Sequence, residues 1–460
     1  MTNFVRLTSI ELNNFKNVEH GEIPFPNYFA VEYKGLIEKP DVVGIYGQNG
    51  TGKTAVIEAL DIAKCFLSGK SASFSEYAGI INGESYLGLS FFMKLGEKKF
   101  KVKYEVKLKV FDSLIGIPWE KITVWDRGAN WKGQKIVEVI NPYYEVGSLT
   151  SDVHATVLQK GDIPQYDFIL NPDKLAVSCA SKGTSFLFNP TLKKTLSEDY
   201  SKDTLPSVLL LMTSFADSNF FVIKVGQLAQ INGRKFLPLN VKDSGDDYII
   251  YGCIPLFLNG VGDIPMKLYE KLNGIIESIN IALRAIIPNL KLEYNKVGEE
   301  TDPNGLVLAK IELYSVRNGR RFSTKYESEG IKRIISLLSC LVSVYNNEGT
   351  TLVVDELDSG IFEFLLGEIL YAIEKDAKGQ LVFTSHNLRA FEKLHNDSIV
   401  CSTTTPANRY VRLTGINKNN NKRDFYIRAL ALGGQKEPLY DCDALDSIGY
   451  AFRRAGRVEV

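Results

Sequence analysis

The most constraining feature of this sequence is the glycine-rich stretch from Gly47 to Thr54. It reads Gly-Gln-Asn-Gly-Thr-Gly-Lys-Thr and fits the pattern G-x-x-x-x-G-K-[ST] in full. The apolar run 42–46 precedes it, and residues 54–67 follow with apolar side chains at helical spacing. A buried strand that enters a glycine loop and leaves as a helix lets backbone N–H groups converge on phosphates. The sequence therefore predicts a nucleoside triphosphate site.

Individual positions of this loop predict individual contacts. We expect backbone contacts to the phosphates from Gly47, Asn49, Gly50 and Gly52. Lys53 is expected to reach the β- and γ-phosphates, and the Thr54 hydroxyl to bind Mg²⁺. The alternative is a glycine turn without a ligand, and the flanking strand and helix disfavour it.

Two acidic residues follow a second apolar run. The predicted strand 351–354 ends in Asp355 and Glu356, whose side chains point in different directions. We assign Asp355 to the metal and Glu356 to the attacking water. Taken alone, the pair is equally well explained as a charged strand end at the surface, and the phosphate loop favours the catalytic interpretation.

A histidine follows a third apolar run. His386 comes directly after the predicted strand 381–384 and Ser385. At this place an imidazole can hydrogen-bond the γ-phosphate or the attacking water. A purely structural histidine is the alternative.

In most of the remaining chain, the spacing of apolar residues indicates either strands or helices. Further strands are expected at 4–12, 86–95, 99–110, 220–231, 248–258, 306–314 and 321–325, and helices at 205–215, 266–287, 331–345 and 361–374. Gly96-Glu97-Lys98 is expected to form a hairpin turn. Strands and helices alternate in the last third, which predicts an α/β fold with a mainly parallel sheet.

Composition limits the classes of partner. Lys plus Arg and Asp plus Glu each number 54, so the formal net charge is zero. This argues against bulk attraction to nucleic acid or anionic lipid. The sequence has no apolar run long enough to span a membrane and no apolar signal core near its first residue. We therefore expect a cytoplasmic protein with no membrane partner.

Together these motifs resemble the ABC-type ATPases, and within them the RecF/SMC/OLD-like branch of AAA-family ATP-binding proteins. The segment Ile10–Lys16 resembles the opening strand and "NFK" turn of that branch. Gly47–Thr54 matches its Walker A motif, and 352–356 its Walker B motif with the catalytic glutamate. Asp358 then corresponds to the D-loop and His386 to the switch histidine. The resemblance implies ATP and Mg²⁺ as cofactors.

The signature motif of such ATPases is degenerate here. Ser328-Glu329-Gly330 resembles the branch's S-x-G form and begins 27 residues before Asp355. In the family, this serine and glycine contact the γ-phosphate that a partner subunit holds, which implies a homodimer or a higher homo-oligomer with ATP between copies. An ordinary helix cap is the alternative for Ser328. No glutamine lies between Ser71 and Leu95, where a Q-loop is expected, so that contact stays unassigned.

The resemblance also implies a domain organisation. It covers roughly residues 1–110 and 300–400 and implies a two-lobed α/β ATPase head with mixed and parallel sheets. The expected division is an N-terminal lobe at 1–110, an inserted α+β lid at 111–300, a C-terminal lobe at 301–400 and an extension at 401–460.

This layout is similar to the ATPase components of two-gene anti-phage modules, such as AriA of PARIS, AbiL-type proteins and PtuA of Septu. It predicts a sensor that controls a separately encoded toxic effector, such as a nuclease, and responds to a phage-derived trigger. A RecF-like DNA-repair ATPase is the alternative, although the neutral charge gives no indication of nucleic acid binding. A scaffold without turnover and a nuclease built on Asp441-Cys442-Asp443 and Asp446 are weaker hypotheses.

Overall fold

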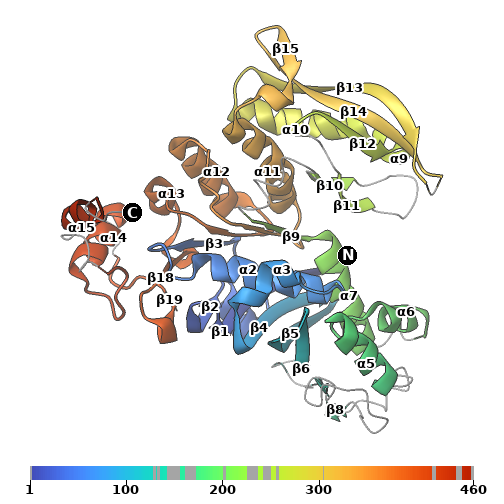
Figure 1. Ribbon diagram of the computed structural model, residues 1–460, viewed down its shortest axis with the longest axis vertical. Coiled ribbons are helices and arrows are strands. Elements are labelled where there is room, and N and C mark those ends of the chain that lie inside the picture. Colours follow the sequence, from blue (N-terminus) through green and yellow to red (C-terminus); the bar gives the residue numbers. More distant parts are fainter. Residues whose placement is uncertain are drawn as a thin grey trace.

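The computed structural model contains two large sheets, a smaller third sheet and the helices around them (Figure 1). It describes residues 3–127, 131, 135–141, 156–160, 172–199, 204–224, 237–241, 250–254, 258–303, 305–416, 421–441 and 448–456. Within these residues, no helix is long and apolar enough to cross a bilayer.

The first sheet, sheet A, is antiparallel throughout, in the order β2-β1-β4-β5-β6-β7-β8. Its strands are β1 (Phe4–Phe15), β2 (Val18–Pro24), β4 (Ile81–Leu95), β5 (Lys98–Phe111), β6 (Leu114–Asp126), β7 (Lys135–Ile140) and β8 (Thr156–Lys160). In β5, buried Phe100 and Val102 alternate with the more exposed Lys101 and Lys103, because successive side chains of a strand point to opposite faces. The predicted hairpin between β4 and β5 is confirmed, with Leu95 paired to Lys98.

The second sheet, sheet B, has the order β19-β18-β3-β17-β16-β9 and is parallel except for β19. Its strands are β3 (Asp41–Tyr46), β9 (Phe220–Ile223), β16 (Thr351–Val354), β17 (Gln380–Thr384), β18 (Ile399–Ser402) and β19 (Tyr410–Val411). Every residue of β3, β16 and β17 is buried, as expected for parallel strands covered on both faces.

Two hydrophobic cores lie on the two faces of sheet B. Val43 and Ile45 of β3 join the core shared with sheet A, α2 (Lys53–Leu67) and α7 (Thr204–Ser218). Val42 and Tyr46 join the other core. Its helices are α10 (Leu272–Ile286), α11 (Glu329–Asn346), α12 (Glu363–Asp376) and α13 (Leu388–Lys393). Figure 1 shows sheet B between these two layers.

The third sheet, sheet C, combines β12-β14-β13 with β15 paired to β14. Its strands are β12 (Val261–Pro265), β13 (Leu290–Thr301), β14 (Val307–Arg317) and β15 (Arg320–Ser323). The remaining elements are α1 (Tyr28–Lys34), α3 (Phe74–Tyr77), α5 (Pro172–Lys182), α6 (Pro190–Asp199), α9 (Met266–Tyr269), α14 (Lys422–Leu432), α15 (Ile448–Ala455) and the pair β10 (Leu237–Val241) and β11 (Ile250–Ile254).

The structure confirms the two-lobed α/β fold, but the described strands of the predicted lid, residues 111–300, are distributed over the three sheets and the separate pair β10–β11. β6, β7 and β8 continue sheet A beyond residue 110, because β6 satisfies the outer hydrogen-bonding edge of β5. β9 enters sheet B beside β16, and β12 and β13 pair with β14. The predicted extension 401–460 likewise begins inside β18, a strand of sheet B.

Some predicted elements differ in extent. The helix expected at 266–287 is two helices, because the N–H of Lys271 bonds to the carbonyl of Leu268 and tightens the chain into a turn. β13 was not predicted, although Leu290 and Leu292 alternate with Lys291 and Glu293 at its start. Its second half is polar and mostly exposed, and it is a strand because it pairs along the length of β14. The strands expected at 220–231 and 248–258 lie partly outside the described residues.

Candidate functional site

The site lies where the parallel strands of sheet B end. Carboxyl ends of parallel strands meet at one edge of a sheet, and ligands bind in the crevice outside that edge. β3 leads into Gly47, β16 into Asp355, β17 into Ser385 and β9 into Lys224. The register aligns them, because Val354 pairs with both Phe383 and Ile223. We call this the carboxyl edge of sheet B.

The phosphate loop is held closely by its surroundings. A Cβ atom at Gly47 would lie 2.1 Å from the Ser402 hydroxyl, so only glycine fits there. Lys53 is the first residue of α2, and its Nζ donates to the carbonyls of Gly47 and Gln48 at 2.9 Å each. The N–H groups in the first turn of a helix have no partner within the helix and point toward its N-terminal end. In α2 this end adjoins the phosphate loop, as in helix termini that bind anions.

A cavity of about 150 Å³ lies beside this loop. Its lining comprises Lys16, Asn17, Asn49, Gly50, Gly52, Lys53, Thr54, Ala55, Asp355, Glu356, Thr384 and His386. The structure thus brings together predicted residues from the phosphate loop, the carboxylate pair and the switch position. Gly47, Asp358, Ser328 and Gly330 are outside this lining.

Thr384 orients the two acidic residues. Its hydroxyl donates to the Asp355 carboxylate at 2.6 Å and accepts from the N–H of Glu356 at 2.7 Å. Glu356 has a φ of 47°, a left-handed conformation that is uncommon for a residue other than glycine. Such strain costs about 1–3 kcal/mol and is held by the surrounding structure, often at functional sites. Thr384 was not among the predicted site residues, although the sequence shows a hydroxyl residue at the end of this apolar run.

An arginine ties the carboxylate pair to α11. Arg333 is 7% exposed and its Nη2 donates to the carbonyls of Asp355, at 3.2 Å, and Glu356. Burial lowers the pKa of Arg333, while the carboxylates of Asp358, Glu356 and Asp355 oppose that shift. Arg333 was not among the predicted site residues, because no local sequence pattern relates a helix residue to a strand end 22 residues later.

His386 is predominantly neutral at pH 7 in this structure. Burial lowers its pKa from the usual 6.5, and the Lys53 ammonium adds to the effect. The carboxylates of Asp358, Glu356 and Asp355 act in the opposite direction. The backbone N–H of His386 donates to the Asp358 carboxylate at 3.2 Å, which connects the switch and D-loop positions.

The turn after β1 supplies a second cation. Lys16 lines the cavity, and its Nζ contacts the two carboxylate oxygens of Glu58 at 3.0 and 2.9 Å. The side-chain amide of Asn17 donates to the carbonyl of Gly50. This turn was predicted only through the family resemblance, and the structure places it against the phosphate loop.

The fourth strand end carries a lysine. Lys224 follows β9 directly, and the N–H of Asp355 donates to the carbonyl of Ile223 at 2.9 Å. The Lys224 ammonium contacts Asp61 of α2 at 2.9 Å and Glu76 of α3 at 2.5 Å. The first residue after β9, beside Asp355, is therefore a lysine whose charge is paired with two carboxylates.

The predicted signature residues lie apart from the phosphate loop of their own chain. Ser328 is the N-cap of α11, and its hydroxyl accepts from the N–H of Ile331 at 3.4 Å. Gly330 packs against Gly360, two residues after the predicted D-loop residue Asp358, since a Cβ atom at Gly330 would lie 2.1 Å from the carbonyl oxygen of Gly360. The helix-cap role is therefore present, and the predicted γ-phosphate contact is not made to the cavity of the same chain.

The residues around the cavity fit ATP with Mg²⁺. A hydroxyl and a carboxylate, from Thr54 and Asp355, are the hard oxygen donors that Mg²⁺ prefers. Burial lowers the pKa of the Lys53 ammonium, and the nearby carboxylates of Asp355, Glu356 and Asp358 counteract this. Lys53 and the start of α2 then provide the positive field that phosphates require.

Residues 9–138 match the family model of an AAA domain. This part of the chain is therefore similar to an AAA domain. The match includes the phosphate loop and most of sheet A but not the carboxylate pair. No curated protein sequence matches the chain.

Solved structures to which the chain is similar include SMC head domains and RecF. The SMC head domain from Thermotoga maritima is 14% identical with a TM-score of 0.36, covering 89% of this chain and 100% of that one. The Pyrococcus furiosus Smc head with an extended coiled coil, bound to the C-terminal domain of ScpA, is 12% identical with a TM-score of 0.41, covering 93% and 99%. RecF with ATP is 15% identical with a TM-score of 0.32, covering 84% and 94%. Because these TM-scores are low, we draw no conclusion from the likenesses.

Proposed function

We propose that this protein hydrolyses ATP with Mg²⁺ and binds each ATP between two copies of the chain. The observation that carries the proposal is the cavity in which Lys53, Glu356 and His386 meet from three strand ends of sheet B. A cation, a carboxylate and a neutral imidazole around one polar cavity match the requirements of phosphoryl transfer to water.

Each group has a defined task in this proposal. Lys53 leaves the carbonyls of Gly47 and Gln48 and binds the β- and γ-phosphates. Thr54 and Asp355 hold Mg²⁺, which supplies charge neutralisation of the phosphates when bound. Glu356 accepts the proton of the attacking water, and His386 hydrogen-bonds the γ-phosphate or that water.

The second copy follows from the position of the signature residues. Ser328 and Gly330 are outside the cavity of their own chain, and Ser328 is exposed. Their proposed contact with the γ-phosphate therefore requires the cavity of another copy. Asp358, the predicted D-loop residue, accepts a hydrogen bond from the backbone N–H of His386. It is two residues before Gly360, which contacts Gly330.

The test is the oligomeric state of Glu356→Gln protein with ATP, measured by light scattering after size exclusion. We expect an ATP-dependent dimer that ADP does not support, because the γ-phosphate bridges the two copies. Adding Ser328→Arg should return this protein to monomers while each monomer still binds ATP. A Glu356→Gln protein that stays monomeric at saturating ATP would contradict the proposal.

For the biological role, we propose an anti-phage sensor that controls a separately encoded effector, such as a nuclease. The support is the sequence resemblance and the zero net charge. Phage plating on cells with this gene and its native neighbour tests it, with Lys53→Ala as the matched control. We expect fewer plaques with the wild type only. Equal plaque counts across a broad phage panel would favour the RecF-like alternative, which predicts DNA-stimulated ATP hydrolysis.

A further inference from the structure

A second cavity, of about 370 Å³, lies where the parallel strands of sheet B begin, at the edge opposite the phosphate loop. Pro40 and Lys378 line it, one and two residues before β3 and β17. Its other wall is the end of sheet A where β1 and β5 begin and β4 ends. We call it the amino-edge cavity. It is separate from the ATP site and has the size of a small-molecule site.

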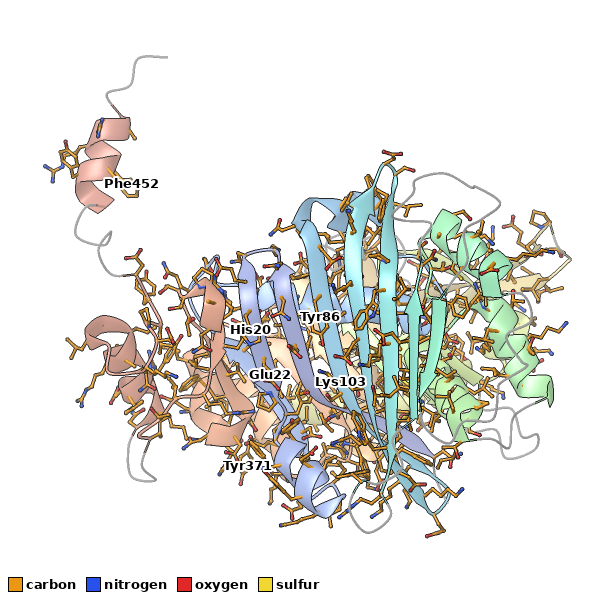
Figure 2. All side chains as sticks on the ribbon, turned by 90° about the horizontal axis from the view of Figure 1, so that it is seen from below. His20, Glu22, Tyr86, Lys103, Tyr371 and Phe452 are labelled. Carbon is orange, nitrogen blue, oxygen red and sulfur yellow. The ribbon has the colours of Figure 1, made fainter. Side chains whose placement is uncertain are left out.

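Sheet A places two lysines side by side in the wall of this cavity. Lys94 of β4 pairs with Lys99 of β5 in the strand register, and both line the cavity. Side chains of directly opposed residues share one face of the sheet, and like charges at such positions are destabilising. Lys99 lies on the same face of β5 as Lys103, which Figure 2 labels. Positive charge is therefore concentrated at one place in the wall.

A third lysine reaches the cavity from the segment before β17. Arg6 fixes the backbone of this segment, because its Nη1 donates to the carbonyl of Lys378 at 2.5 Å. Within the described residues, the ammonium groups of Lys378 and Lys94 have no carboxylate partner. The Lys99 ammonium donates to the carbonyl of Gly35 at 3.2 Å, which leaves its charge unpaired. Three unpaired ammonium groups therefore line one cavity.

The other charged residues around the cavity are neutralised by ion pairs, with one exception. These pairs are Arg6 with Asp41 at 2.8 Å, Lys39 with Asp397 at 2.6 Å and Glu38 with Lys34 at 2.5 Å. The exception is Glu348, an exposed carboxylate in the lining. Three ammonium groups and one carboxylate leave a net charge of about +2 in the cavity at pH 7.

Part of the wall is apolar. Phe4 and Phe92 lie with their ring centroids 6.0 Å apart, and Ile37 packs against this cluster. Leu36 also lines the cavity and is 38% exposed. An inorganic anion alone would leave Leu36 and Ile37 uncovered, whereas an organic group beside the anion would bury apolar surface there. Apolar walls with a few placed charges are typical of small-molecule sites.

We propose that the amino-edge cavity binds a small organic phosphate monoester, with its phosphate between Lys94, Lys99 and Lys378. A phosphate monoester carries about 1.5–2 negative charges at pH 7 and three acceptor oxygens, which match the net charge and the three ammonium donors. Its organic group lies against Leu36 and Ile37. The bound phosphate also relieves the repulsion between Lys94 and Lys99. The proposal does not depend on ATP hydrolysis at the other edge of sheet B.

The test is a ³¹P NMR titration with phenyl phosphate as the probe, on full-length Lys53→Ala protein so that the phosphate loop does not compete. Adding Lys94→Met or Lys378→Met should weaken binding at least about 10-fold, because each removes a charge-assisted hydrogen bond. Lys98→Met is the matched control and should leave binding unchanged, since Lys98 alternates with Lys99 on β5 and is outside the lining. Melting temperatures check folding, and Lys94→Met should not lower the melting temperature.

Two comparison ligands test the chemistry of the site. Benzoate should bind more weakly than phenyl phosphate, because it has one charge and one fewer acceptor oxygen. Inorganic phosphate should also bind more weakly, because it does not cover the apolar wall. Benzoate binding as tightly as phenyl phosphate would overturn the phosphate assignment, and equally tight inorganic phosphate would overturn the organic part.

The wild-type protein distinguishes the two edges of sheet B. Phenyl phosphate that binds the wild type but not Lys53→Ala occupies the phosphate loop, and this result would overturn the proposal. A ³¹P signal of the Lys53→Ala protein that Lys94→Met and Lys378→Met leave unchanged would overturn it as well. Neither result would affect the proposed ATP site, which the Glu356→Gln dimer tests separately.

Discussion

The residues that we assign to ATP lie in two regions that are built differently: the carboxyl edge of sheet B, and the region of Ser328 and Gly330. We call the second region, with its neighbours Tyr326 and Phe362, the signature surface. At the carboxyl edge, Lys53 and Asp355 are 7% and 4% exposed and are held by hydrogen bonds within the chain. At the signature surface, Tyr326 and Phe362 are more than two-thirds exposed. One chain therefore buries the residues that we assign to nucleotide binding and leaves Tyr326 and Phe362 exposed. The comparison predicts that substitutions at the carboxyl edge change ATP binding or hydrolysis by each monomer. Substitutions at the signature surface should change only the activity of assembled copies.

The largest expected effect is on hydrolysis at the carboxyl edge. Glu356→Gln should lower kcat about 10²–10⁴-fold, because the amide cannot accept the proton of the attacking water. ATP affinity should change little. Single-turnover phosphate release and equilibrium binding measure the two quantities. Glu348→Gln, just before the opposite end of β16, is the matched control. Wild-type turnover in Glu356→Gln would remove this residue from its proposed role.

Binding at the same edge should depend on Lys53. Lys53→Ala removes a cation directed at the phosphates and should weaken ATP binding by at least about 100-fold, the scale of charge-assisted hydrogen bonds. Calorimetry on monomeric protein is the measurement. Lys64→Ala, on the same helix and away from the cavity lining, should bind ATP normally. Unchanged affinity in Lys53→Ala would refute the phosphate-loop assignment.

At the signature surface, the expected pattern is the reverse. Ser328→Arg should leave monomer ATP affinity unchanged and lower steady-state hydrolysis about 10–100-fold, because the side chain obstructs the second copy. Titrating protein concentration at fixed ATP distinguishes the two halves, since only the wild type should gain specific activity as dimers form. Equal loss of monomer binding would show that Ser328 acts within its own chain.

Arg333 connects the two regions, and its variants measure how tightly they are coupled. Arg333→Met removes two hydrogen bonds to the carbonyls of Asp355 and Glu356 and should lower hydrolysis about 10-fold. The melting temperature should also fall, because both carbonyls lose a buried donor. Arg333→Lys keeps the charge and should restore part of the activity. Activity that follows only the melting temperature would indicate a structural role.

The smallest expected effect is the pH dependence of binding. The pKa of His386 lies below 6.5 in the free protein, and a γ-phosphate beside it should raise that pKa. ATP should then bind more tightly as pH falls from 7.5 to 6.0, by less than about 10-fold, since one pKa unit is a factor of ten. The same linkage lowers folding stability as pH falls below 6.5, because the unfolded imidazole takes up the proton first. His386→Gln should remove the pH dependence of binding, and a dependence that persists would exclude His386 as its source.

Local patterns in the sequence were enough to predict the phosphate loop and the strands beside it. Gly47–Thr54 and the run 351–354 combine composition and periodicity over a few residues, and the structure confirms both the loop context and the strand. The roles of Thr384 and Arg333 were not predicted, because their hydrogen-bond partners are 29 and 22 residues away in the sequence. The pairing of β6 with sheet A was not predicted. Strand pairing depends on which sheet edge is free, and the sequence of one segment does not contain this information.

The order of strands in sheet B has a consequence for the newly made protein on the ribosome. β3 pairs on one side with β17 and on the other with β18, so Val43 meets its neighbour Val382 only after more than 300 further residues are added. At about 5–20 residues per second this takes roughly 15–70 s. β1, β4 and β5, by contrast, are available from the first 111 residues. Limited proteolysis of stalled chains should find sheet A protected early and β3 cleavable until β18 emerges. During this interval the apolar residues of β3 have no strand partners and can be bound by chaperones.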